Sequence, residues 1–185
     1  MPSKPIHPII KLFKLYLTAS LLSILLASCT INQNKTAGTF APSTQSYSDA
    51  VIQVYAARTW GAKKILAVHT WISVKPQNSQ QYTSYEIIGW RLRRNTSALV
   101  ERTSTPDRDW WGHQPEILLD IRGSKAQQLI PQVIKAVSNY PFKNTYQAWP
   151  GPNSNTFTAY IGQQVPELGL DLPSTAIGKD YREIQ

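Results

Sequence analysis

A serine near the C-terminal end of the chain stands where a helix is expected to begin. Two prolines and a glycine in residues 149–152 predict a tight loop, and Asn153, a residue type that caps helices, follows them. Apolar residues then recur with helical spacing from Phe157 to Val165. Ser154 is therefore expected at the first helical position, among free backbone N–H groups at the positive end of the helix dipole. Such a position suits an anion, an oxyanion or a nucleophile, and it equally suits a plain helix cap.

The part of the chain that precedes this serine is predicted to begin with strands. Residues 51–58, 65–75 and 82–94 are rich in β-branched and aromatic side chains, and short polar turns separate them. Residues 99–102 predict a short fourth strand. Short connections favour antiparallel neighbours, so these segments predict a β-meander.

The middle of the chain is predicted to be helical. Residues 115–121 predict a short helix, and Ser124 is expected to cap a second one, which Pro131 should kink or divide before Tyr140 ends it. Residues 166–185 show no periodicity and are expected to be coil that packs on the domain. The predicted fold class is α+β, with one antiparallel sheet and helices packed against it.

Residues 1–28 are typical of a secretory signal peptide. Three lysines precede an apolar run over residues 15–26, which is too short to span a bilayer. The run ends in Leu26-Ala27-Ser28-Cys29, which resembles the lipobox of bacterial lipoproteins. That resemblance implies cleavage before Cys29, acylation of its thiol with palmitate-type chains and attachment to the membrane. The alternatives are an ordinary signal peptide that contains a cysteine and an uncleaved anchor.

The residues after Cys29 predict where the protein goes and how it is organised. Thr30 stands where an aspartate would favour the inner membrane, so resemblance to sorted lipoproteins implies the outer membrane, with the domain facing the periplasm. Residues 29–48, rich in small polar types, predict a lipidated cysteine and a flexible linker. Residues 49–185 predict one globular domain.

Composition narrows the classes of partner. The full chain carries a formal charge of +8, and loss of the signal peptide removes three lysines and no acidic residue, which leaves +5. Anionic lipids or cell-wall polymers are expected partners of an exported basic domain, and nucleic acid is not. Cys29 is the single cysteine, so no disulfide is expected within the chain. Two domain histidines without clustered carboxylates predict no metal site, and no glycine-rich loop indicates a cofactor.

Most of the domain resembles a family without an assigned activity. Nearly all of residues 51–181 is similar to the domain-of-unknown-function family 3750. The similarity is carried by residues 55–61, 69–71, 88–91, 149–157 and 166–181.

A more distant resemblance implies a mechanism. Permuted papain-like hydrolases, including the PPPDE peptidases, place a histidine on an early strand and a cysteine at a later helix start, in a segment like Asn-Cys-Asn-x-Phe. Here His69 lies in the predicted meander, and Asn153-Ser154-Asn155-Thr156-Phe157 begins a helix. The resemblance implies that His69 and Ser154 meet at one groove and that the helix packs on the same sheet as His69, not on its far face. Val68 and Thr70, which flank His69, should point to the opposite face of the strand.

Serine in place of cysteine leaves two functions open. A serine hydroxyl needs a strong base and an oxyanion hole to react, so Ser154 could be the nucleophile of a serine hydrolase or the trace of a pseudoenzyme. Because no clear third catalytic group is evident, we expect a non-enzymatic envelope lipoprotein that binds an envelope component in a papain-like groove. The alternative is an envelope hydrolase or acyltransferase with Ser154 as nucleophile and His69 as base.

Several other residues are candidates for this groove. Glu86 is the candidate for the group that orients His69, with Asp171 and Asp180 as alternatives. Asn153 and Asn155 are expected beside Ser154. Aromatic side chains could line a sugar- or lipid-binding groove or fill a core, and these are Trp90, Trp110, Trp111 and Trp149.

Overall fold

The computed structural model describes residues 40–59, 61 and 67–184. They fall within one compact unit, residues 36–185. The predicted signal peptide, Cys29 and the first two residues of the strand predicted over 65–75 lie outside the described residues. No helix of the described part is both long and apolar enough to cross a membrane.

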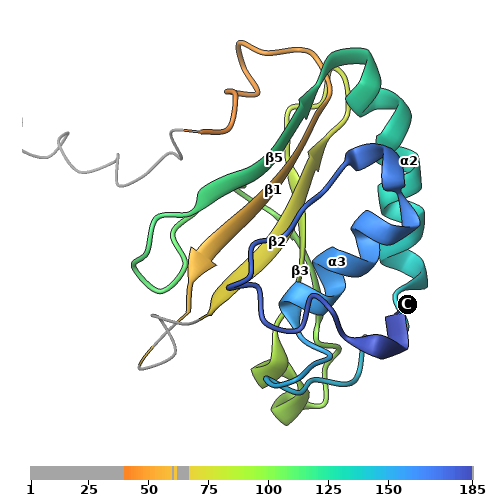
Figure 1. Ribbon diagram of the computed structural model, residues 1–185. Helices are drawn as coiled ribbons and strands as arrows, with labels where there is room; N and C mark the ends of the chain where they lie inside the picture. The colour runs from red at the N-terminus through yellow and green to blue at the C-terminus, as the bar shows by residue number, and fades with distance from the viewer. Residues whose placement is uncertain (1–39, 60, 62–66, 185) are drawn as a thin grey trace, which may run out of the picture. The chain divides into compact units, whose positions relative to one another are not determined.

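Five antiparallel strands form one sheet, which confirms the predicted α+β class (Figure 1). Their order across the sheet is β4-β3-β2-β1-β5, so the first four strands form the predicted meander and the fifth adds to the far edge of β1. The central strands β1 and β2 are buried along almost their whole length, and β2 buries the polar residues His69, Thr70, Ser73 and Lys75 as well as its apolar ones. The strands are β1 (Val51–Arg58), β2 (Val68–Lys75), β3 (Thr83–Ile87), β4 (Leu99–Thr103) and β5 (Glu116–Arg122).

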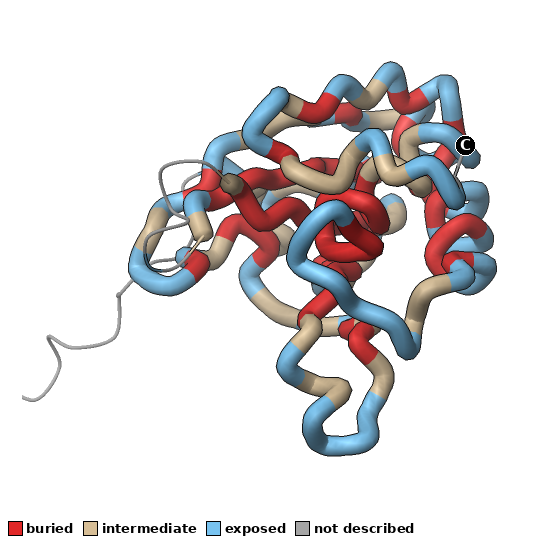
Figure 2. Tube along the Cα trace, turned by 60° about the horizontal axis from the view of Figure 1, so that its bottom comes forward, coloured by how far each residue is buried: buried red, intermediate tan, exposed pale blue. Residues whose placement is uncertain are grey.

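Two helices cover one face of this sheet, and the main core lies between them and the strands (Figure 1). Helix α2 (Gly123–Asn139) contacts β1 and β5, and helix α3 (Ser154–Gln164) contacts β2 and β3. The first two turns of α3 are enclosed on nearly all sides, as the buried segment at the centre of Figure 2 shows. Short 3₁₀ helices connect the rest, and they are η3 (Gly89–Arg94), η4 (Pro166–Leu168) and η5 (Arg182–Ile184).

The other face of the sheet carries a smaller aromatic cluster with buried polar groups. Tyr55, Trp71 and Trp110 are its large members. The loop between β4 and β5 covers it, because the Trp71 indole N–H donates a hydrogen bond to the carbonyl of Pro106 at 2.7 Å. The second layer over this face is therefore made of loops rather than helices.

Residues 40–48, predicted as part of a linker, contact this loop-covered face. The backbone N–H groups of Phe40 and Ala41 donate to the Asp107 carboxylate at 2.7 and 3.0 Å, and Tyr82 donates its hydroxyl to the carbonyl of Pro42. Low hydrophobicity predicted an unattached segment, but backbone groups can dock without apolar side chains. The folded unit thus begins at least nine residues earlier than predicted.

Three predicted elements differ from the structure. Residues 115–121 form β5 rather than a helix, because they pair with the free edge of β1. The third strand stops at Ile87, and residues 89–94 form η3 instead of continuing the strand. Helix α2 is continuous through Pro131, and its N-terminal residue lacks the predicted serine cap.

The position of α3 corrects a further expectation. Thr70, which flanks His69, lies 2.9 Å from the Thr158 hydroxyl of α3, whereas His69 bonds Glu86 and stacks on Trp110 on the other face. Helix α3 therefore packs on the face opposite to the His69 side chain. Val68 and Thr70 do point away from His69, as predicted.

The sheet is open at the end where His69 lies. Strand β2 pairs with β3 only from Ile72 to Val74, so residues 68–71 have no ladder partner on that side. This opening lets the first residue of α3 and the histidine of the opposite face reach one pocket.

Candidate functional site

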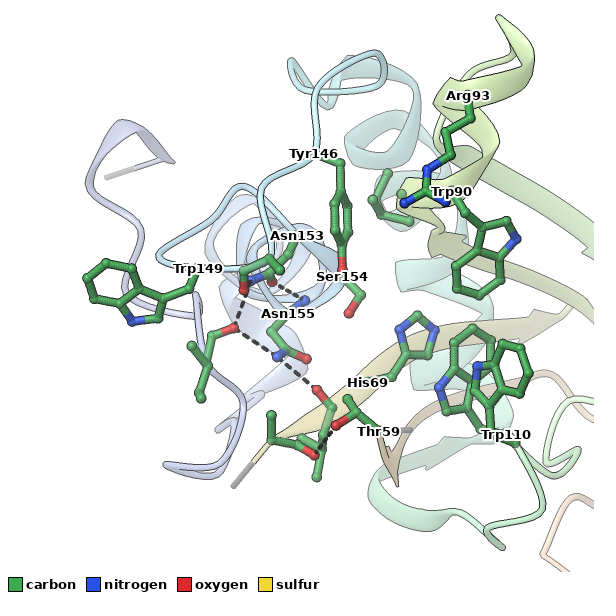
Figure 3. Close-up of a pocket in the computed structure, with 17 residues that line it drawn as sticks. Thr59, His69, Trp90, Arg93, Trp110, Tyr146, Trp149, Asn153, Ser154 and Asn155 are labelled. Atoms are coloured by element: carbon green, nitrogen blue, oxygen red, sulfur yellow. Dashed lines mark hydrogen bonds between the residues drawn. The ribbon is translucent and has the colours of Figure 1, made fainter. Parts of the chain in front are cut away.

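One pocket of about 820 Å³ lies at the open end of the sheet (Figure 3). Its walls come from the start of β2, from the connection that contains η3, from the turn after β4 and from the loop before α3. Most lining side chains are aromatic or apolar, and few are polar. Both His69 and Ser154 line it, and so do Trp90, Trp149, Asn153 and Asn155 from the predicted site, together with Thr59, Arg93, Trp110, Trp111 and Tyr146.

Ser154 is the first residue of α3, as its sequence context predicted. Asn153 is the N-cap, and its side-chain oxygen accepts hydrogen bonds from the N–H groups of Asn155 and Thr156 at 2.9 and 3.2 Å. The Thr156 hydroxyl accepts from the Asn153 N–H, which completes a reciprocal capping box. Ser154 is 5% exposed and faces the pocket.

The two asparagines beside Ser154 have their amide groups engaged within the protein. The Asn153 amide donates to the carbonyls of Ala148 and Ile177, and the Asn155 amide donates to the carbonyls of Val68 and Ile177. These bonds tie the start of α3 to β2 and to the C-terminal coil. Their side-chain contacts position Ser154 and leave their amide groups little capacity for a ligand.

At the start of α3, the backbone N–H of Ser154 is the donor without a hydrogen-bond acceptor among the described residues. The N–H groups of Asn155 and Thr156 are bonded to the cap, and that of Phe157 donates to the Asn153 carbonyl. No hydrogen bond among the described residues uses the Ser154 N–H. One backbone donor at the positive end of the α3 dipole is thus available beside the serine hydroxyl.

His69 is held in the pocket wall by two contacts. Its ring stacks on Trp110 with centroids 3.8 Å apart and planes 7° from parallel, and its Nε2 lies 3.0 Å from Glu86 Oε2. The second contact fixes Nε2 as the protonated nitrogen when Glu86 is ionised. Nδ1 has no hydrogen-bond partner among the described residues, so it carries the free lone pair.

Glu86 is fully buried and is held by two arginines as well as by His69. Arg108 bonds Glu86 Oε1, and Arg102 lies 3.4 Å from the same oxygen. The Arg108 guanidinium also lies 5.2 Å from the Trp71 ring centre and 5.4 Å from that of Trp110. Glu86, the predicted orienting group, therefore bonds His69 directly, while the exposed Asp171 and Asp180 do not line the pocket.

Burial and neighbouring charges set the protonation states of His69 and Glu86. Burial lowers the pKa of His69, an effect that Glu86 opposes and Arg108 reinforces. Burial by itself would raise the pKa of Glu86, but the hydrogen bond from His69 and the Arg108 guanidinium hold it below its usual range. At neutral pH the site therefore holds an ionised Glu86 and a neutral His69, which is the form that can accept a proton.

The serine and the histidine face each other across the pocket without a direct bond. Figure 3 shows both side chains extending into the same pocket. No hydrogen bond among the described residues joins them. Serine–base pairs are often loose without a ligand and tighten when substrate binds. The two side chains therefore line one pocket without a hydrogen bond between them.

Tyr146, which the sequence analysis missed, completes the wall next to the serine. Its hydroxyl points toward Ser154 in Figure 3 and has no hydrogen-bond partner among the described residues. The ring lies directly on Gly89, where an added Cβ would meet Tyr146 Cδ1 at 2.3 Å. Burial raises the pKa of Tyr146, so the phenol is protonated and can donate. The glycine next to Trp90 was the one sequence signal for this close approach.

Two further observations concern His113, the second histidine of the domain, and metal binding. The turn 110–113 closes through reciprocal backbone hydrogen bonds of 2.9 Å between Trp110 and His113, so His113 shapes the loop that carries Trp110. Within the described residues no group of three or more His, Cys, Asp or Glu side chains could hold a metal ion.

Comparison with known proteins identifies the domain but not an activity. The family model described as "Protein of unknown function (DUF3750)" matches residues 49–181, which is most of the chain. No curated protein and no solved structure gives a significant match.

Proposed function

We propose that this chain, which belongs to the DUF3750 family of proteins of unknown function, is an acyl hydrolase or acyltransferase with Ser154 as nucleophile and His69 as base. One set of observations carries the proposal: a buried histidine, bonded through Nε2 to an ionised glutamate, lines the same pocket as a helix-start serine, and its Nδ1 has no hydrogen-bond partner among the described residues. A purely structural histidine would need neither the free nitrogen nor the facing hydroxyl.

The proposed reaction gives each group of the site a role. His69 Nδ1 takes the proton of the Ser154 hydroxyl as the oxygen attacks the carbonyl carbon of an ester or amide. Glu86 stabilises the imidazolium through the Nε2–H bond, as the third member of a triad does. The Ser154 N–H, the α3 dipole and the Tyr146 hydroxyl stabilise the oxyanion. His69 then protonates the leaving alcohol or amine, and water or an acceptor alcohol releases the acyl group from Ser154.

The proposal extends to the location of the enzyme. Acylated Cys29 would tether the domain to the bacterial envelope, with the outer membrane as the expected site and the pocket facing the periplasm. The support for this is the signal-like residues 1–28 and the lipobox resemblance. Several acyl chains on one cysteine are enough for stable anchoring.

A binding protein without catalysis is the second candidate. The observation that favours it is the missing hydrogen bond between Ser154 and His69, together with serine in place of the cysteine of papain-like hydrolases. In that case the same pocket would hold an envelope component without turning it over, and Ser154 would serve only as the first residue of α3.

A fluorophosphonate probe separates the two candidates. Such a probe forms a covalent bond with a serine hydroxyl that a base activates, so it should label the purified full chain at Ser154, as located by peptide mass spectrometry. Ser154→Ala should abolish labelling, and His69→Gln should slow it about 100-fold or more. Ser154→Cys should react with thiol-directed acylating probes if the geometry is papain-like.

The chain offers a matched control. Ser124 also lies at the start of a helix, but it is exposed and lines no part of the pocket. Ser124→Ala should label like the unaltered protein. Absence of labelling at Ser154 in a correctly folded protein would leave the binding function as the better account.

A further inference from the structure

We infer that the substrate of this site is an anionic phospholipid, whose acyl group enters the aromatic pocket while its charged headgroup contacts Arg93 and Arg94 at the mouth. The inference rests on the proposed function, and it names the substrate class that the pocket selects.

The lining of the pocket favours a hydrocarbon ligand. Trp90, Trp111 and Trp149 are 46%, 57% and 73% exposed, respectively, so their rings form the outer walls, and Ile87 and Val68 lie deeper. A volume of about 820 Å³ is large enough to enclose most of a drug-sized molecule. Exposed aromatic groups at a pocket mouth are also typical of proteins that work at a membrane interface.

Most polar groups of the pocket already form hydrogen bonds within the protein, so the pocket is poorly suited to bind a sugar. A polyhydroxylated ligand needs many donors and acceptors, but the amides of Asn153 and Asn155 and the hydroxyl of Thr59 all donate to backbone carbonyls. The groups that remain are clustered around Ser154, where a single carbonyl would sit. This pattern fits one ester in an otherwise apolar chain and disfavours a glycan.

The mouth carries positive charge that no acidic side chain neutralises. Arg93 lines the pocket and is exposed on η3, three residues after Trp90; the next residue, Arg94, is exposed beside it, and η3 has no acidic residue in its first turn. No salt bridge within the described part of the chain involves either arginine. In Figure 3 Arg93 lies on the same side of the pocket as Trp90. A phosphate held there would leave its acyl chain next to the tryptophan wall.

Tryptophan quenching by brominated lipids tests this inference without requiring turnover. The full chain in neutral-detergent micelles is titrated with brominated phosphatidylglycerol or with brominated phosphatidylcholine, which share acyl chains and differ in headgroup charge. We expect stronger quenching by the anionic lipid. Arg93→Gln with Arg94→Gln should weaken its apparent affinity roughly 25-fold, at about fivefold for each charge. Phosphatidylcholine, whose choline cation offsets the charge of its phosphate, should lose much less affinity.

A second charge pair is the matched control. Lys125 and Lys135 are exposed on α2 and line no part of the pocket. Lys125→Gln with Lys135→Gln removes the same charge and should leave both titrations unchanged. Equal loss of binding in the two double variants would show that net charge alone attracts the lipid, and it would overturn the inference.

Failure of the inference and failure of the proposed function give different results. Fluorophosphonate labelling of Ser154 with equal quenching by both lipids would keep the hydrolase and reject the anionic lipid. Preferential quenching by phosphatidylglycerol without labelling would keep the lipid and reject the hydrolase. Displacement of the brominated lipid by soluble cell-wall fragments but not by unlabelled phosphatidylglycerol would assign the pocket to a glycan, and would also overturn the inference.

Discussion

Replacing Glu86 with glutamine tests the interaction that holds the site together. The change is nearly isosteric and removes one charge from a side chain that is fully buried between His69 and Arg108. Breaking a buried ion pair by neutralising one partner typically costs about 3–5 kcal/mol, because the other charge stays buried without compensation. Arg108 keeps 19% of its side chain exposed, so it can turn partly toward water. We therefore expect the lower end, about 3 kcal/mol of unfolding free energy.

Thermal unfolding followed by circular dichroism measures this loss. For a chain of this size, 3 kcal/mol corresponds to a decrease in Tm of roughly 6–12 °C. Glu116→Gln is the control, because Glu116 is exposed on β5 and forms no described salt bridge. It should unfold within about 0.5 kcal/mol of the unaltered protein.

A second substitution shows whether the loss comes from the uncompensated arginine. Adding Arg108→Gln to Glu86→Gln removes the buried positive charge, so the double variant should be more stable than the sum of the two single changes predicts. If Glu86→Gln and Glu116→Gln unfold alike, the charge network does not stabilise the fold and our account of the site is wrong.

Four further predictions concern the pH dependence of stability, the pocket wall beside Ser154 and the proposed lipid anchor. The unfolding free energy should fall as the pH drops below about 6.5, and again below about 4.5. The reason is that the pKa values of His69 and Glu86 are both lowered in the folded protein, so the unfolded chain binds protons first. Denaturant titrations over this pH range measure the unfolding free energy, and a stability that rises toward acid would contradict the prediction. Tyr146→Phe should reduce the rate of ester hydrolysis about 100-fold with little change in KM, as expected for a lost oxyanion donor, whereas a change confined to KM would assign Tyr146 to substrate binding. Gly89→Ala should also reduce the rate, because its Cβ would displace the Tyr146 ring, and a rate like that of the unaltered protein would contradict that contact. Cys29→Ala should abolish incorporation of labelled palmitate and either leave unprocessed precursor or release the domain from membranes, and a processed variant that still fractionates with membranes would refute the lipoprotein assignment.

The start of α3 could be predicted from sequence because its determinants are local. Asn153 caps the helix with its own side chain, and the proline-containing loop excludes helix before it. The strands 51–58 and 68–75 were equally visible, because β-branched and aromatic side chains fill a sheet that is buried on both faces.

Strand β5 shows where local reasoning fails. Its residues Glu116 to Arg122 include strong helix formers, yet β1 offers an unpaired edge and the ladder with it outweighs that preference. The prediction that α3 packs on the same face as His69 was wrong for a similar reason. Alternation placed Thr70 opposite His69, but which of those faces a distant helix would cover depends on packing across the whole domain.

The site was predictable where residues sit on regular elements and not where loops supply them. Glu86 was a candidate because strand alternation places it beside β2, although its bond to His69 depends on the register between Ile72 and Tyr85. Arg108 and Tyr146 come from loops, where no periodicity indicates which way a side chain points. Loop residues that contact a strand over long sequence distances have no local signal.

The contact between Phe40 and Asp107 sets the length of the linker that would join this domain to the membrane. The carboxylate accepts hydrogen bonds from the backbone N–H groups of Phe40 and Ala41, so the chain is attached to the domain at residue 40 as well as at the start of β1. With a lipid on Cys29, as proposed, the chain from position 29 to position 40 reaches on the order of 40 Å at full extension. The pocket would then meet its own bilayer at an effective concentration on the order of millimolar and would seldom reach molecules dissolved far from it. Lengthening this linker by a few tens of residues should therefore lower the rate of hydrolysis of membrane lipid and leave the rate of hydrolysis of a soluble ester unchanged.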